Sequence, residues 1–149
     1  MRKISNYNYN GPSMYPVFKP GDGIIINKDI GFEQLKKGDV VCFNSKSVHY
    51  NIVHRIVKKV PNGYITRGDN NRDCDEGILT VNLQPELVTF VRRGDKTIKV
   101  FGGFLGMLVH RKNLIRKYFM LYTRSPLKRI LDIFEKTGFS IKFNYILKN

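Results

Sequence analysis

Short apolar runs that alternate with turn-forming residues fill the first hundred positions, and they restrict the fold more than any other feature of the sequence. The runs with strand-like composition lie at residues 23–27, 39–44, 50–60, 64–67, 86–92 and 97–101. They are separated by Gly, Pro and Asp clusters such as Pro61-Asn62-Gly63, where a turn needs a fixed or a positive φ. Many short strands at this spacing are typical of antiparallel folds. We therefore predict a mainly β fold for residues 1–100, a small antiparallel barrel or sandwich with one helical turn at residues 32–36.

The periodicity changes after Phe101. Residues that recur at helical spacing are Leu108, Ile115, Phe119 and Tyr122, with a polar side formed by Lys112, Asn113, Arg116 and Lys117. Ser125 and Gly138 are of the types that start and stop a second helix, and residues 139–145 alternate like a strand. We expect residues 101–149 to form a basic helical extension that ends in a short strand and packs on the core.

The chain of 149 residues has a formal net charge of +14, and this charge is concentrated near the C-terminus. Residues 101–149 contain 10 of the 26 basic residues and 2 of the 12 acidic ones. An anionic partner is therefore expected: a nucleic acid, an acidic peptide or an anionic membrane surface. No run reaches the roughly 18 apolar residues that span a bilayer, and the N-terminus lacks the apolar segment of a signal peptide. We expect a cytoplasmic protein. For the basic tail we favour a helix that packs on the core. Peripheral contact of the tail with a membrane is the alternative.

Three short segments contain residue types used in acyl transfer, although each has an ordinary structural explanation by itself. Ser13 lies in a stiff segment flanked by prolines, which could present its hydroxyl at a fixed angle. His54 lies in a β-branched run, where its imidazole is either a packed core group or a general base for a serine. Asp69, Asp73 and Asp75 follow in a turn-like segment, and a carboxylate can orient a catalytic histidine.

In this order the segments resemble the type I signal peptidases, a family of membrane-linked serine proteases with a β-rich catalytic core. The family's Ser-Met-x-Pro motif matches residues 13–16, and the Gly-Asp pair that follows it matches residues 21–22. A further Gly-Asp pair before a strand matches residues 38–39, and Gly-Asp-Asn-Asn matches residues 68–71. Val-His-Arg at residues 53–55 is similar to the archaeal and endoplasmic-reticulum branch, which uses His where most bacterial members use Lys. The resemblance covers roughly residues 11–90.

The resemblance implies a serine endopeptidase with Ser13 as the nucleophile and His54 as the general base. Asp75 is the first choice for the aspartate that orients His54, and Asp69 is the second. The residues implied around the oxyanion and the substrate are Met14, Pro16 and Gly11. Some members carry a side-chain hydroxyl at the position of Gly11 that donates to the oxyanion. In this chain that donor is either absent or comes from another residue. The implied substrate is a leader or other small peptide with a small residue before the scissile bond.

Three alternatives stay open. Lys58 or Lys59 could act as the base, as in the self-cleaving repressor proteases, if the lysine were buried. The chain could instead be a basic module that binds nucleic acid, but its basic residues cluster in the tail and not among strand aromatics, which disfavours this partner. It could also be a non-catalytic interaction module, as Gly11 suggests. Neither a metal nor a cofactor is expected, since the His and Cys residues lack paired ligand spacing.

Overall fold

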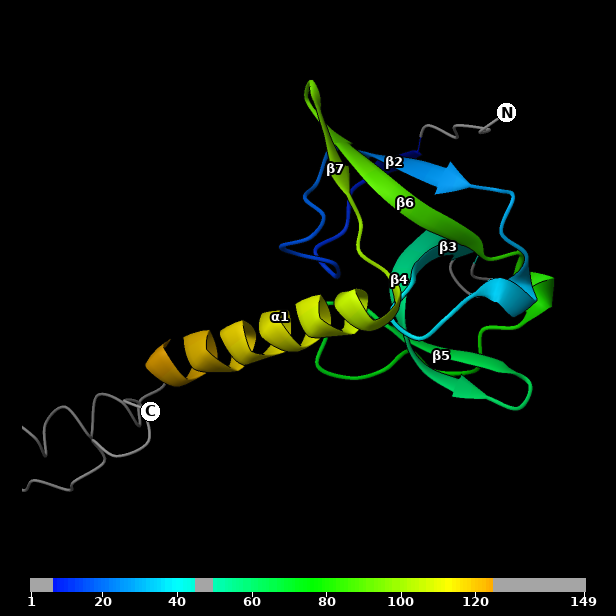
Figure 1. Ribbon diagram of the computed structural model, residues 1–149. Coiled ribbons are helices and arrows are strands. Elements are labelled where there is room, and N and C mark those ends of the chain that lie inside the picture. Colours follow the sequence, from blue (N-terminus) through cyan, green and yellow to red (C-terminus); the bar gives the residue numbers. More distant parts are fainter. Residues whose placement is uncertain (1–6, 45–49, 125–149) are drawn as a thin grey trace, which may run out of the picture. The chain divides into compact units, whose positions relative to one another are not determined.

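The computed structural model describes residues 7–44 and 50–124, in which the strands form one antiparallel sheet. The strands are β1 (Tyr7–Tyr9), β2 (Asp22–Asn27), β3 (Val40–Asn44), β4 (Asn51–Val60), β5 (Gly63–Arg67), β6 (Glu86–Arg93) and β7 (Lys96–Lys99). Within the same ranges, 3₁₀ turns lie at Phe32–Gln34 and Val81–Leu83, and the helix α1 spans Gly103–Arg124. The prediction of a mainly β fold followed by a helix is confirmed (Figure 1).

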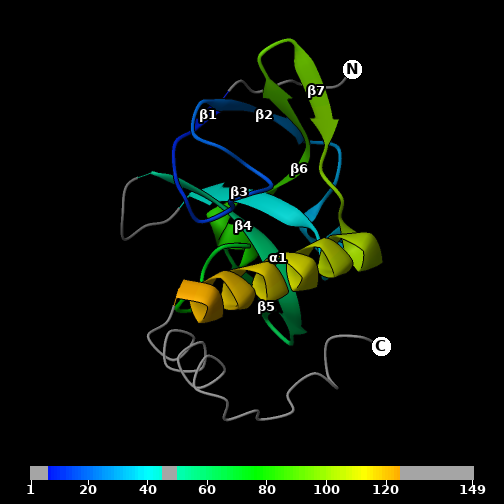
Figure 2. The ribbon, with the colours of Figure 1, turned by 90° about the vertical axis from the view of Figure 1, so that its left-hand side faces the viewer.

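The sheet brings together strands that lie far apart in the sequence. Its order is β1-β2-β6-β3-β4-β5, and β7 pairs with β6. Strand β6 thus lies between β2 and β3, while β4 and β5 form a hairpin at the other end of the order (Figure 2). The register shifts between Ile25 and Ile26 in β2 and between Ile56 and Lys58 in β4. Such irregularities bend a strand and increase its twist, which favours a curved sheet.

Strand β3 is buried on both faces, because successive side chains of a strand point to opposite sides of the sheet. Val40 and Cys42 belong to one buried cluster, which also contains Met14 from the loop between β1 and β2. Val41 and Phe43 belong to a second buried cluster. The loop around Met14 is therefore anchored in the core.

Helix α1 is buried along a face that differs from the predicted apolar one. The chain divides into the units 1–114 and 115–149, so only the first part of α1 is described together with the sheet. The buried residues of this part are Gly106, His110 and Asn113. A Cβ atom at Gly106 would collide with the carbonyl oxygen of Gly38, so the close approach requires glycine. In contrast, Leu108 is 45% exposed, although the periodicity placed it on the apolar side.

The observed bounds of the predicted strands agree with the sequence-based ones to within two residues. Strand β1 was not predicted, because Tyr-Asn-Tyr is too short and too polar to show a strand pattern. The predicted helix after Ser125 and the predicted strand at residues 139–145 lie outside the described residues. Within the described ranges, no helix combines the length and the apolar content needed to cross a membrane.

Candidate active site

The loop that carries Ser13 is fixed by the Gly-Asp-Asn-Asn segment. The backbone N–H of Asn70 donates to the carbonyl oxygen of Ser13 at 2.6 Å, and the side-chain amide of Asn70 donates to the carbonyl oxygen of Pro12 at 3.2 Å. A Cβ atom at Gly68 would lie 2.6 Å from the Ser13 carbonyl oxygen, so only glycine permits this approach. Two motifs separated by more than fifty residues therefore pack directly against each other.

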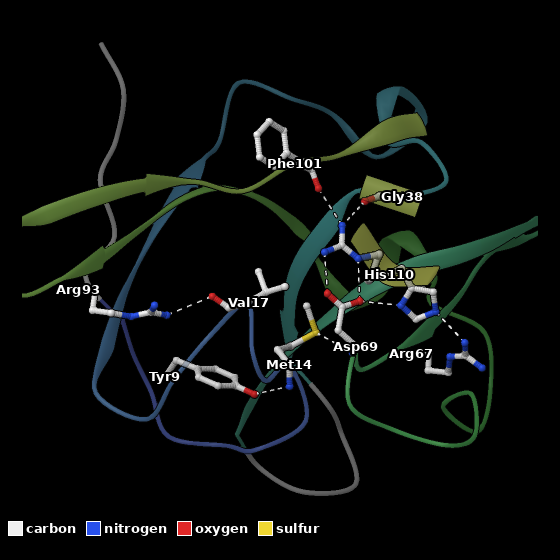
Figure 3. Close-up of polar contacts among 10 residues, drawn as sticks. Tyr9, Met14, Val17, Gly38, Arg67, Asp69, Arg93, Phe101 and His110 are labelled. Atoms are coloured by element: carbon white, nitrogen blue, oxygen red, sulfur yellow. Dashed lines mark hydrogen bonds and ion pairs between the residues drawn. The ribbon is translucent and has the colours of Figure 1, made fainter. Parts of the chain in front are cut away.

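The hydroxyl of Ser13 lies beside the phenol of Tyr9. The two oxygen atoms, Ser13 Oγ and Tyr9 Oη, are 3.1 Å apart. The Tyr9 oxygen also accepts the backbone N–H of Met14 at 2.9 Å (Figure 3). The ring of Tyr9 is 6% exposed and packs against Phe18, with 5.4 Å between the ring centroids. The phenol is thus held in place from both ends.

His54 is oriented by Asp75. Its Nδ1 atom lies 2.5 Å from Oδ2 of Asp75, and the same carboxylate oxygen accepts the hydroxyl of Thr66 at 2.6 Å. The backbone N–H of Asp75 donates to the carbonyl oxygen of Thr66 at 2.9 Å, which fixes the carboxylate relative to β5. When the carboxylate accepts a hydrogen bond from Nδ1–H, the Nε2 lone pair of a neutral imidazole is available as a base.

Ser13 and His54 line the same cavity, whose volume is about 670 Å³. Its wall is formed largely by β1, the loop that follows it and the start of β4, with Ile24, Cys42 and Asn71 from other elements. Among the described residues, the Ser13 hydroxyl is hydrogen-bonded to Tyr9 and not to His54. Hydrogen bonds between a nucleophile and its base are often long without a substrate and shorten when one binds.

The second candidate aspartate, Asp69, has different partners. Its carboxylate forms a two-pronged ion pair with Arg55, at 2.8 Å and 2.7 Å, and both side chains are buried. Arg55 also donates to the carbonyl oxygens of Gly38 at 2.6 Å and Phe101 at 2.8 Å. The backbone N–H of Asp69 donates to the sulfur of Met14 at 3.3 Å. Asp69 therefore contacts the Ser13 loop through Met14 and does not orient His54.

A histidine of α1 completes this network. His110 Nδ1 lies 2.7 Å from Oδ1 of Asp69, and His110 Nε2 lies 2.7 Å from Nη2 of Arg67. A guanidinium has no acceptor, so Nε2 accepts a hydrogen bond from Arg67 and Nδ1 donates one to Asp69. Of the two neutral tautomers of the imidazole, only the one with its hydrogen on Nδ1 fits both hydrogen bonds.

Burial alone raises the pKa of the Asp69 carboxyl, but hydrogen bonds from Arg55 and His110, together with the charge of Arg55, outweigh this effect. The net pKa lies below its ordinary value of 3.8. The network is therefore built around an ionised carboxylate.

Of the other residues named from the sequence, some line the cavity and others do not. Gly11 lines the cavity, whereas Pro16 is not among the described residues that form its wall. Met14 is fully buried, donates its N–H to Tyr9 and is not among the described residues that line the cavity. Lys58 and Lys59 are exposed and do not line the cavity. A lysine must be buried to lose its proton near neutral pH, so neither residue has the surroundings that a lysine base needs. The bulge next to Lys58 explains this, because it breaks the alternation with His54.

Three residues of the site, Tyr9, Thr66 and His110, belong to none of the sequence motifs, and Arg55 belongs only to the Val-His-Arg segment at residues 53–55. The one available signal was Arg55, a charged residue within an apolar strand, since a buried arginine requires a partner such as Asp69. In the described ranges, no group of three His, Cys, Asp or Glu side chains is arranged to hold a metal ion.

Comparisons with known proteins agree with the motifs. A family model described as signal peptidase, peptidase S26, matches residues 1–72. The chain is similar to the signal peptidase complex catalytic subunit SEC11 of Fusarium vanettenii, with 38% identity over 68 residues, which is 42% of this chain and 39% of the relative. The corresponding subunit of Metarhizium robertsii is 37% identical over 68 residues, covering 42% of this chain and 39% of the relative. That of Sclerotinia sclerotiorum is 39% identical over 64 residues, covering 40% and 37%.

The chain thus matches about two fifths of the length of these relatives. The range of the family model contains Ser13 and His54 and ends before Asp75. No solved structure matches the chain.

Proposed function

Because the signal peptidase family model matches residues 1–72, we propose that the chain is a serine endopeptidase of this family, with Ser13 as nucleophile, His54 as general base and Asp75 as the residue that orients His54. One observation supports this assignment most directly. The His54 ring is hydrogen-bonded to Asp75 through Nδ1 and shares a cavity with the Ser13 hydroxyl. Nε2 of His54, which carries the lone pair in this tautomer, is then the acceptor for the serine proton.

The reaction is an acyl transfer in two halves. Ser13 Oγ attacks the peptide carbonyl carbon while its proton passes to Nε2 of His54, and the carbonyl π electrons move to the oxygen. The C–N bond then breaks, and His54 returns the proton to the leaving amine. Water attacks the acyl-enzyme in the same way and releases Ser13. Asp75 keeps its negative charge throughout and stabilises the imidazolium that forms in each half.

The cavity suits an extended peptide. Its wall includes β1, which stands at one end of the strand order in the described part of the sheet, so a substrate strand can pair with its open edge. Tyr7, Ile24 and Ile52 give the wall an apolar character. We infer cleavage after a small residue in a leader or other small peptide, as the family resemblance implies.

The first experiment compares the rates at which a fluorophosphonate probe labels the wild type and three variants. His54→Ala should slow labelling by about 10²–10⁴-fold, the range that a general base contributes. Asp75→Asn should also slow it, because Asn can fix the wrong tautomer of His54. Lys58→Ala is the matched control and should label at the wild-type rate. Equal labelling of wild type and His54→Ala, or loss of labelling in Lys58→Ala alone, would reject the assignment.

A second proposal concerns the membrane. Phe104, Ile115 and Phe119 share one face of α1 at helical spacing and are 78%, 69% and 60% exposed. Helix α1 contains no Asp or Glu, and its exposed Arg111 and Lys112 are positively charged. Exposed apolar side chains combined with basic ones, and without acidic ones, are a feature of helices that lie on anionic membrane surfaces. We infer that α1 makes such a peripheral contact.

A further inference from the structure

The proposed reaction places negative charge on the substrate's carbonyl oxygen, and this charge needs hydrogen-bond donors. Few backbone donors are available beside Ser13. Pro12 has no N–H, and the N–H of Met14 is already donated to Tyr9. The N–H of Ser13 itself remains, and Gly11 contributes no side chain. A second donor must come from another residue.

The phenol of Tyr9 has one proton to donate, and the geometry identifies its acceptor. Tyr9 is buried, and its oxygen accepts the Met14 N–H at 2.9 Å. Among the described residues, the partner left for the phenolic proton is Ser13 Oγ, at 3.1 Å. A buried tyrosine hydroxyl normally donates to a partner. Tyr9 is therefore the donor, and the proton of Ser13 stays free to be taken by His54.

The bond from Met14 also makes the phenol a better donor. A hydroxyl that accepts one hydrogen bond while donating another is polarised by the first, and the two bonds strengthen each other. The buried surroundings of Tyr9 act in the same direction, because electrostatic interactions are stronger at low dielectric.

The position of the phenol relative to Gly11 is a second, independent observation. A Cβ atom built at Gly11 would lie 3.4 Å from Tyr9 Oη and 3.6 Å from its Cζ. The Tyr9 hydroxyl thus occupies the place toward which a side chain at position 11 would point. That side of the Ser13 loop lines the cavity, because both Tyr9 and Gly11 are part of its wall.

We propose that Tyr9 is a catalytic residue that supplies the second oxyanion donor from the place left open by Gly11. Before attack its O–H donates to Ser13 Oγ. As the Oγ–C bond forms and the carbonyl π electrons move to oxygen, the same O–H turns to that oxygen, which is bonded to the same carbon as Oγ. The Tyr9 proton is never transferred, while the Ser13 proton goes to His54 and then to the leaving amine. The inference rests on the proposed function.

The test measures how fast Ser13 reacts with the fluorophosphonate probe, whose phosphoryl oxygen takes the place of the carbonyl oxygen. The maximal rate and the half-saturating probe concentration are determined separately. Tyr9→Phe removes the hydroxyl alone, and it should lower the maximal rate by about 10²-fold with little change in half-saturation. Tyr64→Phe is the matched control. It removes a buried hydroxyl bonded to the carbonyl oxygens of Phe32 and Leu35, away from the cavity, and should keep the wild-type rate.

Two double variants separate catalysis from folding. Adding Gly11→Ser to Tyr9→Phe places a hydroxyl where the phenol was, and it should restore the maximal rate at least tenfold. Adding Gly11→Ala to Tyr9→Phe gives the same Cβ without a hydroxyl and should restore nothing. A full rate in Tyr9→Phe, or equal rates in the two double variants, would overturn the role of Tyr9 while the proposed function stands. An unreactive wild type would overturn both.

Discussion

His110 of α1 and Asp69 of the segment after β5 share a hydrogen bond of 2.7 Å between Nδ1 and Oδ1. Asp69 in turn binds Arg55 with its carboxylate and the Met14 sulfur with its N–H. The first part of α1 is therefore linked through two contacts to the loop of the proposed nucleophile. A helix that looks like an appendage in the sequence takes part in the support of the site.

Replacing His110 with Phe should destabilise the protein by about 1–3 kcal/mol, the usual cost of leaving buried polar partners unsatisfied. The change removes one partner from Asp69 and one from Arg67. Urea unfolding followed by circular dichroism measures the effect. Lys112→Ala, an exposed position on the same helix, is the control and should change stability by no more than about 0.5 kcal/mol. An unfolding midpoint of His110→Phe equal to that of the control would contradict the role of this contact.

Acid should destabilise the protein through Asp69. The folded-state pKa of its carboxyl lies below the ordinary value of 3.8, so its ion pair adds stability above that value. This contribution is lost as the pH falls through the lower, folded-state pKa. We therefore expect the free energy of unfolding to decrease more steeply below about pH 4 in the wild type than in Asp69→Asn.

A second variant keeps this test decisive if Asp69→Asn does not fold. Burial raises the pKa of Asp22, but hydrogen bonds from Arg93 and from the backbone N–H of Lys19 outweigh this effect, so the net pKa lies below its ordinary value of 3.8. In Asp22→Asn the free energy of unfolding should therefore also decrease less steeply below about pH 4 than in the wild type. Urea titrations over about pH 3–6 measure the slopes. Identical slopes in the wild type and in each folded variant would contradict the assigned pKa shifts.

The two cysteines should differ sharply in reactivity. Cys42 is buried in the cavity wall, and burial raises the pKa of its thiol to about 12, so almost no thiolate exists at neutral pH. Cys74 is exposed. Iodoacetamide should therefore alkylate Cys74 in the native protein and reach Cys42 only after unfolding. Peptide mass mapping reads out both positions, and rapid native alkylation of Cys42 would show that the cavity wall is open.

Contact of α1 with membranes is tested by flotation with lipid vesicles. The wild type should bind vesicles that contain phosphatidylglycerol, and binding should weaken in high salt because the basic side chains contribute. Replacing both Phe104 and Phe119 with Ser should abolish binding. Ile98→Ser, at an exposed position of strand β7, is the control and should bind as the wild type does. Equal binding of the double variant and the wild type would reject the proposed surface.

The sequence predicted the strands and the main chemical groups because their signals are local. Turn residues divide the strands, and short motifs mark Ser13, His54 and the aspartates. The preference for Asp75 over Asp69 rested on the family resemblance, and the hydrogen bond between His54 and Asp75 became visible only in the structure. The buried face of α1 was missed for a physical reason: His110 is buried by its polar partners, which lie on other elements, so hydrophobic periodicity does not mark it.

Tyr9 illustrates the same limit within the site. Its distance in sequence from Ser13 resembles no motif, and its hydroxyl becomes relevant only because the turn after β1 folds back on it. The absence of a side chain at Gly11 was visible in the sequence, but the group that stands there instead was not.

The most direct test of the account is to find which atom becomes covalently modified. The wild type is treated with the fluorophosphonate probe, digested, and sequenced by tandem mass spectrometry. We predict a single adduct on the Oγ atom of Ser13, which disappears in Ser13→Ala. An adduct on another residue, or a labelled Ser13→Ala protein, would contradict the assignment of Ser13 as the nucleophile.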